Sequence, residues 1–111
     1  ELHGHVRDAV DSKHGNYVIQ KVVEVLPAAR SDFVVEELRG VGASYARHRY
    51  GCRIFCRLLE HFGTSSSLAA LTDEVLHEAG VLVRHPFAHH VMEAVLEFGL
   101  HEQLRKIVAA L

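Results

Sequence analysis

The sequence predicts an all-α solenoid, in which helical repeats stack side by side. The first observation is an internal repeat: three blocks of similar sequence lie 36 and 37 residues apart in the 111-residue chain. Fixed periods of this size are typical of helical repeat proteins. The second observation is the spacing inside each block, where apolar residues fall at i, i+1, i+4 and i+5, as on one stripe of a helix. A strand would instead alternate every two residues.

The three blocks span residues 15–24, 51–60 and 88–97, and each runs from a small residue to a glutamate. Each block also carries two pairs of adjacent apolar residues. The pairs are Val18-Ile19 and Val22-Val23, then Ile54-Phe55 and Leu58-Leu59, then Val91-Met92 and Val95-Leu96. We expect all of these residues to form the core, because a stacked repeat buries its apolar stripe against its neighbours.

Shorter signals complete the helical pattern around the blocks. Ser12 and His14 are expected to cap or line the turn before the first block, and Ser31 is a candidate N-cap for a helix after it. Pro27 and Gly63 lie just past the first two block helices, where helices commonly end. The remaining helical patterns fall at residues 31–38, 68–79 and 102–111.

The composition fits a packed domain, with 49% hydrophobic and 23% charged residues. No apolar run approaches the roughly 20 residues that span a bilayer, and no signal-peptide pattern is visible. Cys52 and Cys56 lie one helical turn apart and suit a reduced intracellular protein better than a disulfide framework. These features predict a cytoplasmic location. Because the chain starts at Glu1 rather than methionine, we expect it to be a piece of a longer protein.

Three stretches of the chain resemble a known family. They are GNYVIQK at 15–21, HRYGCRIFCRLLEH at 48–61 and HPFAHHVMEAVLEFG at 85–99. Together they resemble the Pumilio, or PUF, repeat. The resemblance covers essentially the whole chain as one partial domain, 1–111, with repeats of about 2–34, 35–71 and 72–111. It implies a right-handed superhelical α-solenoid.

The resemblance also implies a function, which is the binding of single-stranded RNA, in particular the 3′ untranslated regions of messenger RNA. In this family the outcome is post-transcriptional and translational regulation, achieved by recruiting protein partners rather than by catalysis. We therefore expect no enzyme activity, no cofactor, no small-molecule substrate and no membrane partner. A solenoid that binds proteins, with little or no RNA binding, remains the alternative, because helical repeats generally present such surfaces.

In the Pumilio family, the central helix of each repeat presents a trio of side chains to RNA. Two of them contact the edge of one base, and the residue after the first one stacks on a neighbouring base. Matched by position, the edge contacts in this chain are Asn16 and Gln20, Cys52 and Cys56, and His89 and Glu93, and the stacking residues are Tyr17, Arg53 and His90. The residue types fit these roles, because tyrosine, arginine and histidine side chains all stack on bases.

The edge residues predict which base each repeat prefers. The amides of Asn16 and Gln20 each carry a donor and an acceptor, which suits uracil, whereas ionised Glu93 only accepts and suits guanine. Cys56 stands where the family usually has glutamine, so we expect this repeat to discriminate poorly, with adenine as the best fit. At the position of His89, the family usually has serine or another small polar residue. Since the family runs antiparallel to its RNA, the implied triplet is 5′-G-(A or any)-U-3′.

The net charge of −2 conceals a separation of charge along the chain. Residues 13–24, 47–60 and 84–97 together hold seven Lys and Arg residues against four Glu, a net of +3. The intervening residues 31–39 and 68–79 hold one Arg against six acidic residues, a net of −5. If the block helices line one face, that face attracts RNA, but only weakly. The salt dependence of binding should then be shallow.

Ten histidines raise the question of a metal site. Two groupings supply ligands of the right type, namely His3 with His5, and His85 with His89 and Cys56. His48 and His85 occupy equivalent positions in two repeats, which favours a structural role, so no metal is expected. Glu93 beside a histidine could do acid–base chemistry, but no nucleophile or phosphate-binding loop accompanies it. No catalytic residue is expected.

Overall fold

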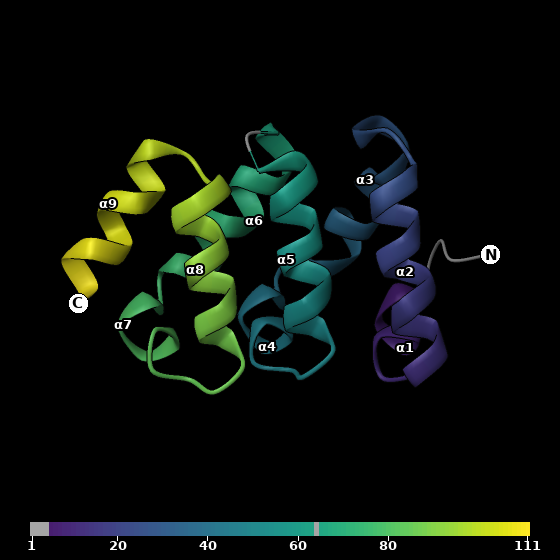
Figure 1. Ribbon diagram of the computed structural model, residues 1–111, viewed down its shortest axis with the longest axis horizontal. Coiled ribbons are helices and arrows are strands. Elements are labelled where there is room, and N and C mark those ends of the chain that lie inside the picture. Colours follow the sequence, from purple (N-terminus) through teal and green to yellow (C-terminus); the bar gives the residue numbers. More distant parts are fainter. Residues whose placement is uncertain (1–4, 64) are drawn as a thin grey trace.

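The computed structural model describes residues 5–63 and 65–111, with the backbone alone for residues 28–31. These residues form helices and no strand (Figure 1), which confirms the all-α prediction. His3 and the predicted start of the first repeat at residue 2 lie outside them. The helices are α1 (Val6–Val10), α2 (Lys13–Val25), α3 (Ala28–Leu38), α4 (Gly42–Ala46), α5 (Gly51–Phe62), α6 (Ser66–Leu76), α7 (Ala79–Leu82), α8 (Ala88–Phe98) and α9 (His101–Ala110).

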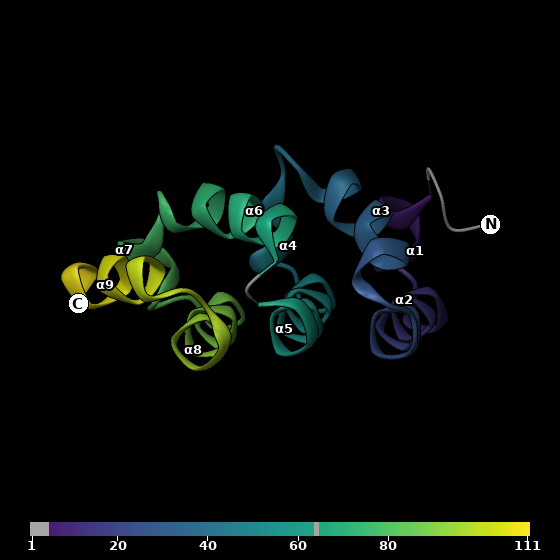
Figure 2. The same cartoon turned by 90° about the horizontal axis from the view of Figure 1, so that it is seen from above.

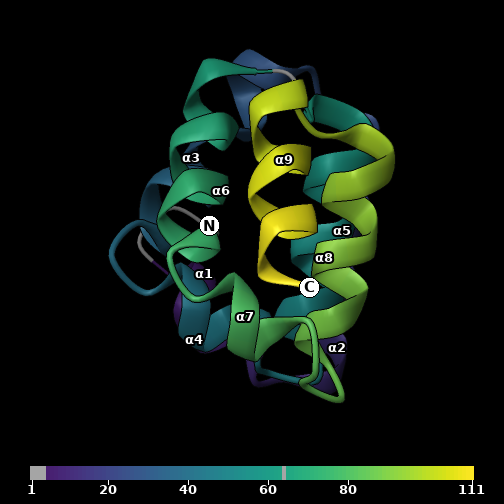
Figure 3. The ribbon, with the colours of Figure 1, turned by 90° about the vertical axis from the view of Figure 1, so that its left-hand side faces the viewer.

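The helices form three groups that stack along the longest dimension of the molecule. The molecule measures 40 × 25 × 21 Å. The block helices α2, α5 and α8 form one layer, and α3, α6 and α9 lie in the layer behind it (Figure 2). Viewed along the stack, α5 and α8 lie on one side of the molecule, and α3 and α6 on the other (Figure 3). The predicted solenoid is confirmed. None of the helices in the described ranges combines the length and apolar character needed to cross a membrane.

The block helices pack through their apolar stripes, and the middle helix is the most completely enclosed. α5 lies between α2 and α8, and all four of its paired apolar residues are buried. In the outer repeats, the expectation that every paired residue belongs to the core is wrong, since Val18 is 46% and Leu96 is 39% exposed. Among the described residues, each outer block helix has a block helix on one side only, so part of its stripe faces solvent.

Specific residues determine where α2 and α3 begin. Ser12 caps α2 as expected, with its hydroxyl oxygen accepting from the Gly15 N–H at 3.0 Å. α3 begins at Ala28 rather than after Ser31, whose side chain lies outside the described residues. Pro27 accounts for the early start, because its φ of −62° suits the entry to a helix.

Glutamates on the third helix of a repeat hold the start of its first helix. In the middle repeat, the Glu74 carboxylate accepts from the N–H groups of Gly40 at 2.9 Å and Gly42 at 3.0 Å. In the first repeat, Glu37 accepts from the Val6 N–H at 3.1 Å. These bonds connect the third helix of a repeat to its first helix, so the structural units run from α1 to α3 and from α4 to α6. The approximate repeat boundaries predicted after residues 34 and 71 lie within α3 and α6.

Candidate nucleic-acid interface

All of the predicted contact residues lie on the three block helices, and therefore in one layer of the molecule (Figure 2). The first and last members of each trio are four residues apart, so they lie on the same side of their helix. The stacking of α2, α5 and α8 brings the three trios into a row. The trios are Asn16, Tyr17 and Gln20 on α2, Cys52, Arg53 and Cys56 on α5, and His89, His90 and Glu93 on α8.

The first residue of each trio is turned towards the protein and bonded to the start of its own helix. Asn16 is 4% exposed, and its Nδ2 donates to the carbonyl oxygens of Ser12 at 2.8 Å and Lys13 at 2.9 Å. Cys52 is also 4% exposed, and its thiol donates to the Arg49 carbonyl oxygen at 3.4 Å. These bonds leave little of either side chain on the surface.

The third trio follows the same pattern at its first position. His89 is half-buried, and its Nδ1 donates to the His85 carbonyl oxygen at 2.9 Å. The other two members, His90 and Glu93, are exposed, and His90 Nδ1 lies 3.6 Å from a Glu93 carboxylate oxygen. His89 is therefore oriented by the backbone of His85, while the exposed side chains of His90 and Glu93 are accessible to a ligand.

The middle residue of each trio faces solvent. Tyr17 is 60% exposed, and Arg53 and His90 are exposed as well. Cations lie near aromatic rings: Lys21 Nζ is 5.6 Å from the centroid of the Tyr17 ring on the same helix, and the Arg53 guanidinium is 5.9 Å from the ring of Tyr50, the residue before α5. Flat, accessible side chains of these kinds can stack on bases.

Gln20 has the best-defined geometry among the last residues of the trios. It is half-buried, and its Nε2 donates to Asn16 Oδ1 at 2.9 Å. Because this bond uses one N–H of the amide, the second N–H and the carbonyl oxygen of Gln20 stay available. One donor beside one acceptor complements the O4 and N3–H of uracil.

The two cysteines of the second trio are free thiols. Burial, with a smaller effect from the neighbouring Cys52, raises the pKa of Cys56 to about 11. Burial also raises the pKa of the Cys52 thiol. Both side chains are therefore protonated at neutral pH. A protonated thiol is a weak donor and a weak acceptor, which fits the expected poor discrimination in this repeat.

A groove of about 680 Å³ runs between α5 and α8. It exposes Arg53 and Cys56 from one helix and His90 and Glu93 from the other. Its charges balance, because three arginines and three glutamates line it: Arg49, Arg53 and Arg57, and Glu60, Glu93 and Glu97. The basic excess expected for the block helices therefore lies outside this groove, and electrostatic attraction inside it is weak.

Two histidines cap the starts of α5 and α8, which is more specific than the structural role predicted from their equivalent positions. His48 Nδ1 accepts from the N–H groups of Tyr50 at 3.0 Å and Gly51 at 3.1 Å, and its Nε2 lies 2.7 Å from Asp11 Oδ1 in the first repeat. His85 Nδ1 accepts in the same way at the start of α8. The repeat offsets could have revealed this, because both histidines occupy the position of the capping residue of α2.

Comparison with known proteins agrees with this geometry. The sequence model of the Pumilio-family RNA binding repeat matches residues 12–39, 43–76 and 81–111. Over 99 residues the chain is 29% identical to Pumilio homology domain family member 4 of Saccharomyces cerevisiae, covering 86% of this chain and 11% of that protein. Over 95 residues it is 34% identical to Putative pumilio homolog 13 of Arabidopsis thaliana, covering 86% of this chain and 18% of that protein.

A solved structure of similar fold is the Puf3 RNA binding domain bound to the Cox17 RNA 3′ UTR recognition sequence site B. It matches with a TM-score of 0.86 and 28% identity over 98% of this chain and 31% of that chain. The chain thus spans less than a fifth of the two curated relatives and about a third of the solved domain. The three matched segments cover most of its length, and each contains one block helix and the helix that follows it. The chain belongs to the Pumilio-family RNA binding repeat proteins.

Proposed function

We propose that this chain binds single-stranded RNA in a sequence-specific way, with one base read by each repeat. The observation that carries the proposal is the row of three trios on α2, α5 and α8. Each trio has one exposed stacking side chain, and each has an edge residue one helical turn further on. A row of stacking platforms with polar edges beside them is how single-stranded RNA is commonly recognised.

The proposed assignment of bases follows from the last residue of each trio. Gln20, held by Asn16, presents a donor and an acceptor and reads uracil. Cys56 contributes little discrimination and fits adenine best. Glu93 accepts from the N1–H and N2–H₂ groups of guanine. With RNA running antiparallel to the repeats, the preferred triplet is 5′-G-(A or any)-U-3′.

The proposed setting is regulatory rather than enzymatic. Residues 1–111 act as part of a longer array of repeats, which binds 3′ untranslated regions of messenger RNA in the cytoplasm and recruits regulatory proteins. The similar Puf3 RNA binding domain supports the choice of RNA, since the RNA bound to that protein is a 3′ UTR recognition sequence. The trios contain no nucleophile with an adjacent base, so we propose no catalytic step.

Three repeats alone should bind weakly. Stacking contributes about 1–3 kcal/mol per base, and a good edge contact adds about 1–3 kcal/mol. Association and ordering cost several kcal/mol or more. With one well-defined edge contact, at Gln20, we expect a Kd on the order of micromolar or weaker.

Fluorescence anisotropy with a short labelled RNA containing GAU tests the proposal. Tyr17→Ala should weaken binding at least fivefold, because a stacking contact worth about 1 kcal/mol or more is lost. Tyr17→Phe is the matched control and should retain most of the affinity, since the ring remains. Gln20→Ala should reduce the preference for uracil over the other bases. If the wild type does not bind RNA, or binds it equally well after both alanine substitutions, the protein-binding alternative replaces this proposal.

A further inference from the structure

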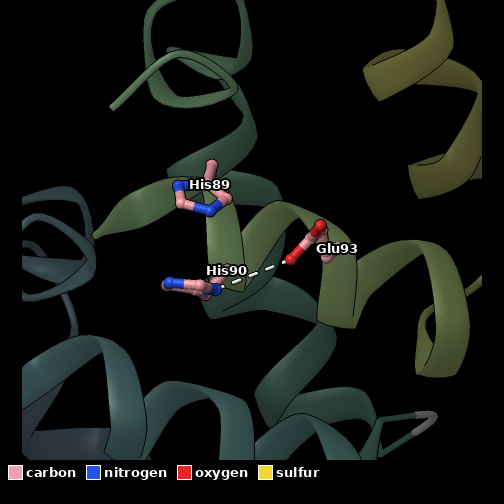
Figure 4. Close-up of side chains that lie close together, drawn as sticks. All are labelled: His89, His90 and Glu93. Carbon is pink, nitrogen blue, oxygen red and sulfur yellow. Dashed lines mark ion pairs between the residues drawn. The ribbon is translucent and has the colours of Figure 1, made fainter. Parts of the chain in front are cut away.

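The third trio has a second feature besides its place in the row. Figure 4 shows His89, His90 and Glu93 gathered on one side of α8. The two imidazole ring centroids are 3.9 Å apart, although consecutive residues of a helix point about 100° away from each other. Taking one nitrogen or oxygen from each side chain, the three atoms all lie within 4.8 Å of one another.

The donor types match a particular class of ion. Imidazole nitrogens together with a carboxylate oxygen suit Zn²⁺, Cu²⁺ or Ni²⁺, whereas Mg²⁺ and Ca²⁺ prefer oxygen ligands alone. Around a tetrahedral zinc ion, ligand atoms at about 2.1 Å from the metal lie roughly 3.4 Å from each other. Only small rotations are needed to reach this spacing. The side chains of His90 and Glu93 can make them, since they are 56% and 70% exposed.

His89 is already held in the way that metal-binding histidines are held. Its Nδ1–H donates to the His85 carbonyl oxygen at 2.9 Å, which fixes the ring and leaves the lone pair on Nε2. The Nδ1 of His85 is occupied by two backbone N–H groups at the start of α8. His85 therefore supports the group, and His89, His90 and Glu93 supply the ligands. This set differs from the grouping that the sequence suggested, in which Cys56 took part.

We propose that His89, His90 and Glu93 form a binding site for one divalent transition-metal ion such as Zn²⁺, with water completing its coordination. The site opens on the groove between α5 and α8, which His90 and Glu93 line, so water and ligands can reach the ion. All three ligands also belong to the third trio, in which His89 and Glu93 are the expected edge contacts and His90 is the proposed stacking residue. An ion bound there would occupy the atoms that would otherwise meet guanine.

Ion binding at α8 and competition between the ion and RNA can be tested separately. Ion binding rests only on the geometry of α8 and needs no RNA. Competition between the ion and RNA at the third repeat rests on the proposed function. Coupling between two ligands is reciprocal. RNA should therefore lower the affinity for the ion by the same factor by which the ion lowers the affinity for RNA.

Isothermal titration of the chain with ZnCl₂ in a non-chelating buffer tests the first part. We expect one saturable site, weakened tenfold or more by His90→Ala and by Glu93→Gln. Both side chains are exposed, so these variants should keep the helical circular dichroism of the wild type. His77→Ala and His101→Ala are matched controls, because they remove exposed histidines from other parts of the fold and should leave the affinity unchanged.

Two results would overturn the ion site: no saturable zinc binding, or binding that survives both His90→Ala and Glu93→Gln, which would place the zinc at other histidines. The competition is measured separately, by RNA anisotropy with and without saturating zinc. Weaker binding to a GAU-containing RNA in zinc, restored by EDTA, supports it. Unchanged RNA affinity in zinc refutes the competition, and absence of RNA binding in EDTA refutes the proposed function without affecting the ion titration.

Discussion

At the scale of single residues, the three trios differ most in their last member. Gln20 offers a donor and an acceptor, Cys56 a protonated thiol, and Glu93 a carboxylate. These positions follow from the resemblance to the Pumilio repeat, matched onto the three blocks, and their contacts with RNA stay a prediction. The sequence did not show that Asn16 is buried and bonded to the Ser12 carbonyl oxygen, since that contact depends on how the chain turns into α2.

The last residue of the second trio, Cys56, can be replaced by one that discriminates better between bases. Cys56→Gln should create a preference for adenine at the central base, because an amide supplies both a donor and an acceptor where the thiol supplies neither well. The adjoining groove of about 680 Å³ has room for the longer side chain. A good edge contact is worth about 1–3 kcal/mol, so the gain over the other bases should be at least fivefold by anisotropy.

The control for this change is Cys56→Ser, which keeps a small side chain and should not create the preference. Equal affinity of the Cys56→Gln variant for RNAs with all four central bases would show that this position does not read a base.

The raised pKa of Cys56 predicts how this thiol reacts. Only the thiolate is alkylated, so a pKa of about 11 means that the rate with iodoacetamide should keep rising between pH 7 and pH 10. In urea the pKa of the thiol returns to a value near 9.0, and its rate of alkylation should level off above that pH. Mass spectrometry of the Cys56 peptide measures both rates. A plateau near pH 9 in the folded protein would contradict the predicted shift.

At the scale of helices, the apolar stripes allowed α2, α5 and α8 to be predicted from the sequence. The short helices α1, α4 and α7 were not predicted, because four or five residues are too few to display a helical period. Tertiary bonds help to form them, such as those from Glu74 to the backbone at the start of α4. The start of α3 was also misplaced, since the effect of Pro27 was assigned only to the end of the preceding helix.

The capping role of His48 predicts a loss of stability on substitution. His48→Ala removes the acceptor for two N–H groups at the start of α5 and should lower the free energy of unfolding by about 1 kcal/mol. His48→Ser should recover part of this loss, because serine caps the equivalent helix α2. Both variants lose the contact with Asp11, so the difference between their free energies of unfolding reports the contribution of the cap alone. Urea unfolding followed by circular dichroism measures it, and equal stability of the two variants would argue against the cap.

At the scale of the whole molecule, stacking explains both the fold and the placement of the trios. The middle repeat buries its full apolar stripe, while the outer repeats leave Val18 and Leu96 partly exposed. The sequence predicted the stack but not this gradation, because burial depends on neighbours and not on residue type. The sequence also suggested a basic face, whereas the groove between α5 and α8 holds as many glutamates as arginines.

This balance of charge predicts a shallow response of RNA binding to salt. For single strands, the slope of log K against log salt is about −0.7 per phosphate neutralised. With few unopposed cations near the trios, we expect a slope between zero and about −2. Anisotropy titrations at several salt concentrations provide the value. A slope steeper than about −4 would mean that phosphate contacts, rather than base contacts, dominate binding.

The most direct test of one-base-per-repeat reading is selection of bound RNAs from a random single-stranded pool. The wild-type chain should enrich G-x-U, with the 3′ uracil stacked on Tyr17 and read by Gln20, which Asn16 holds in place. A parallel selection with Gln20→Ala should lose the uracil while keeping the guanine. Enrichment of no common motif, or of one whose uracil is unchanged in the Gln20→Ala selection, would contradict the assignment of bases to repeats.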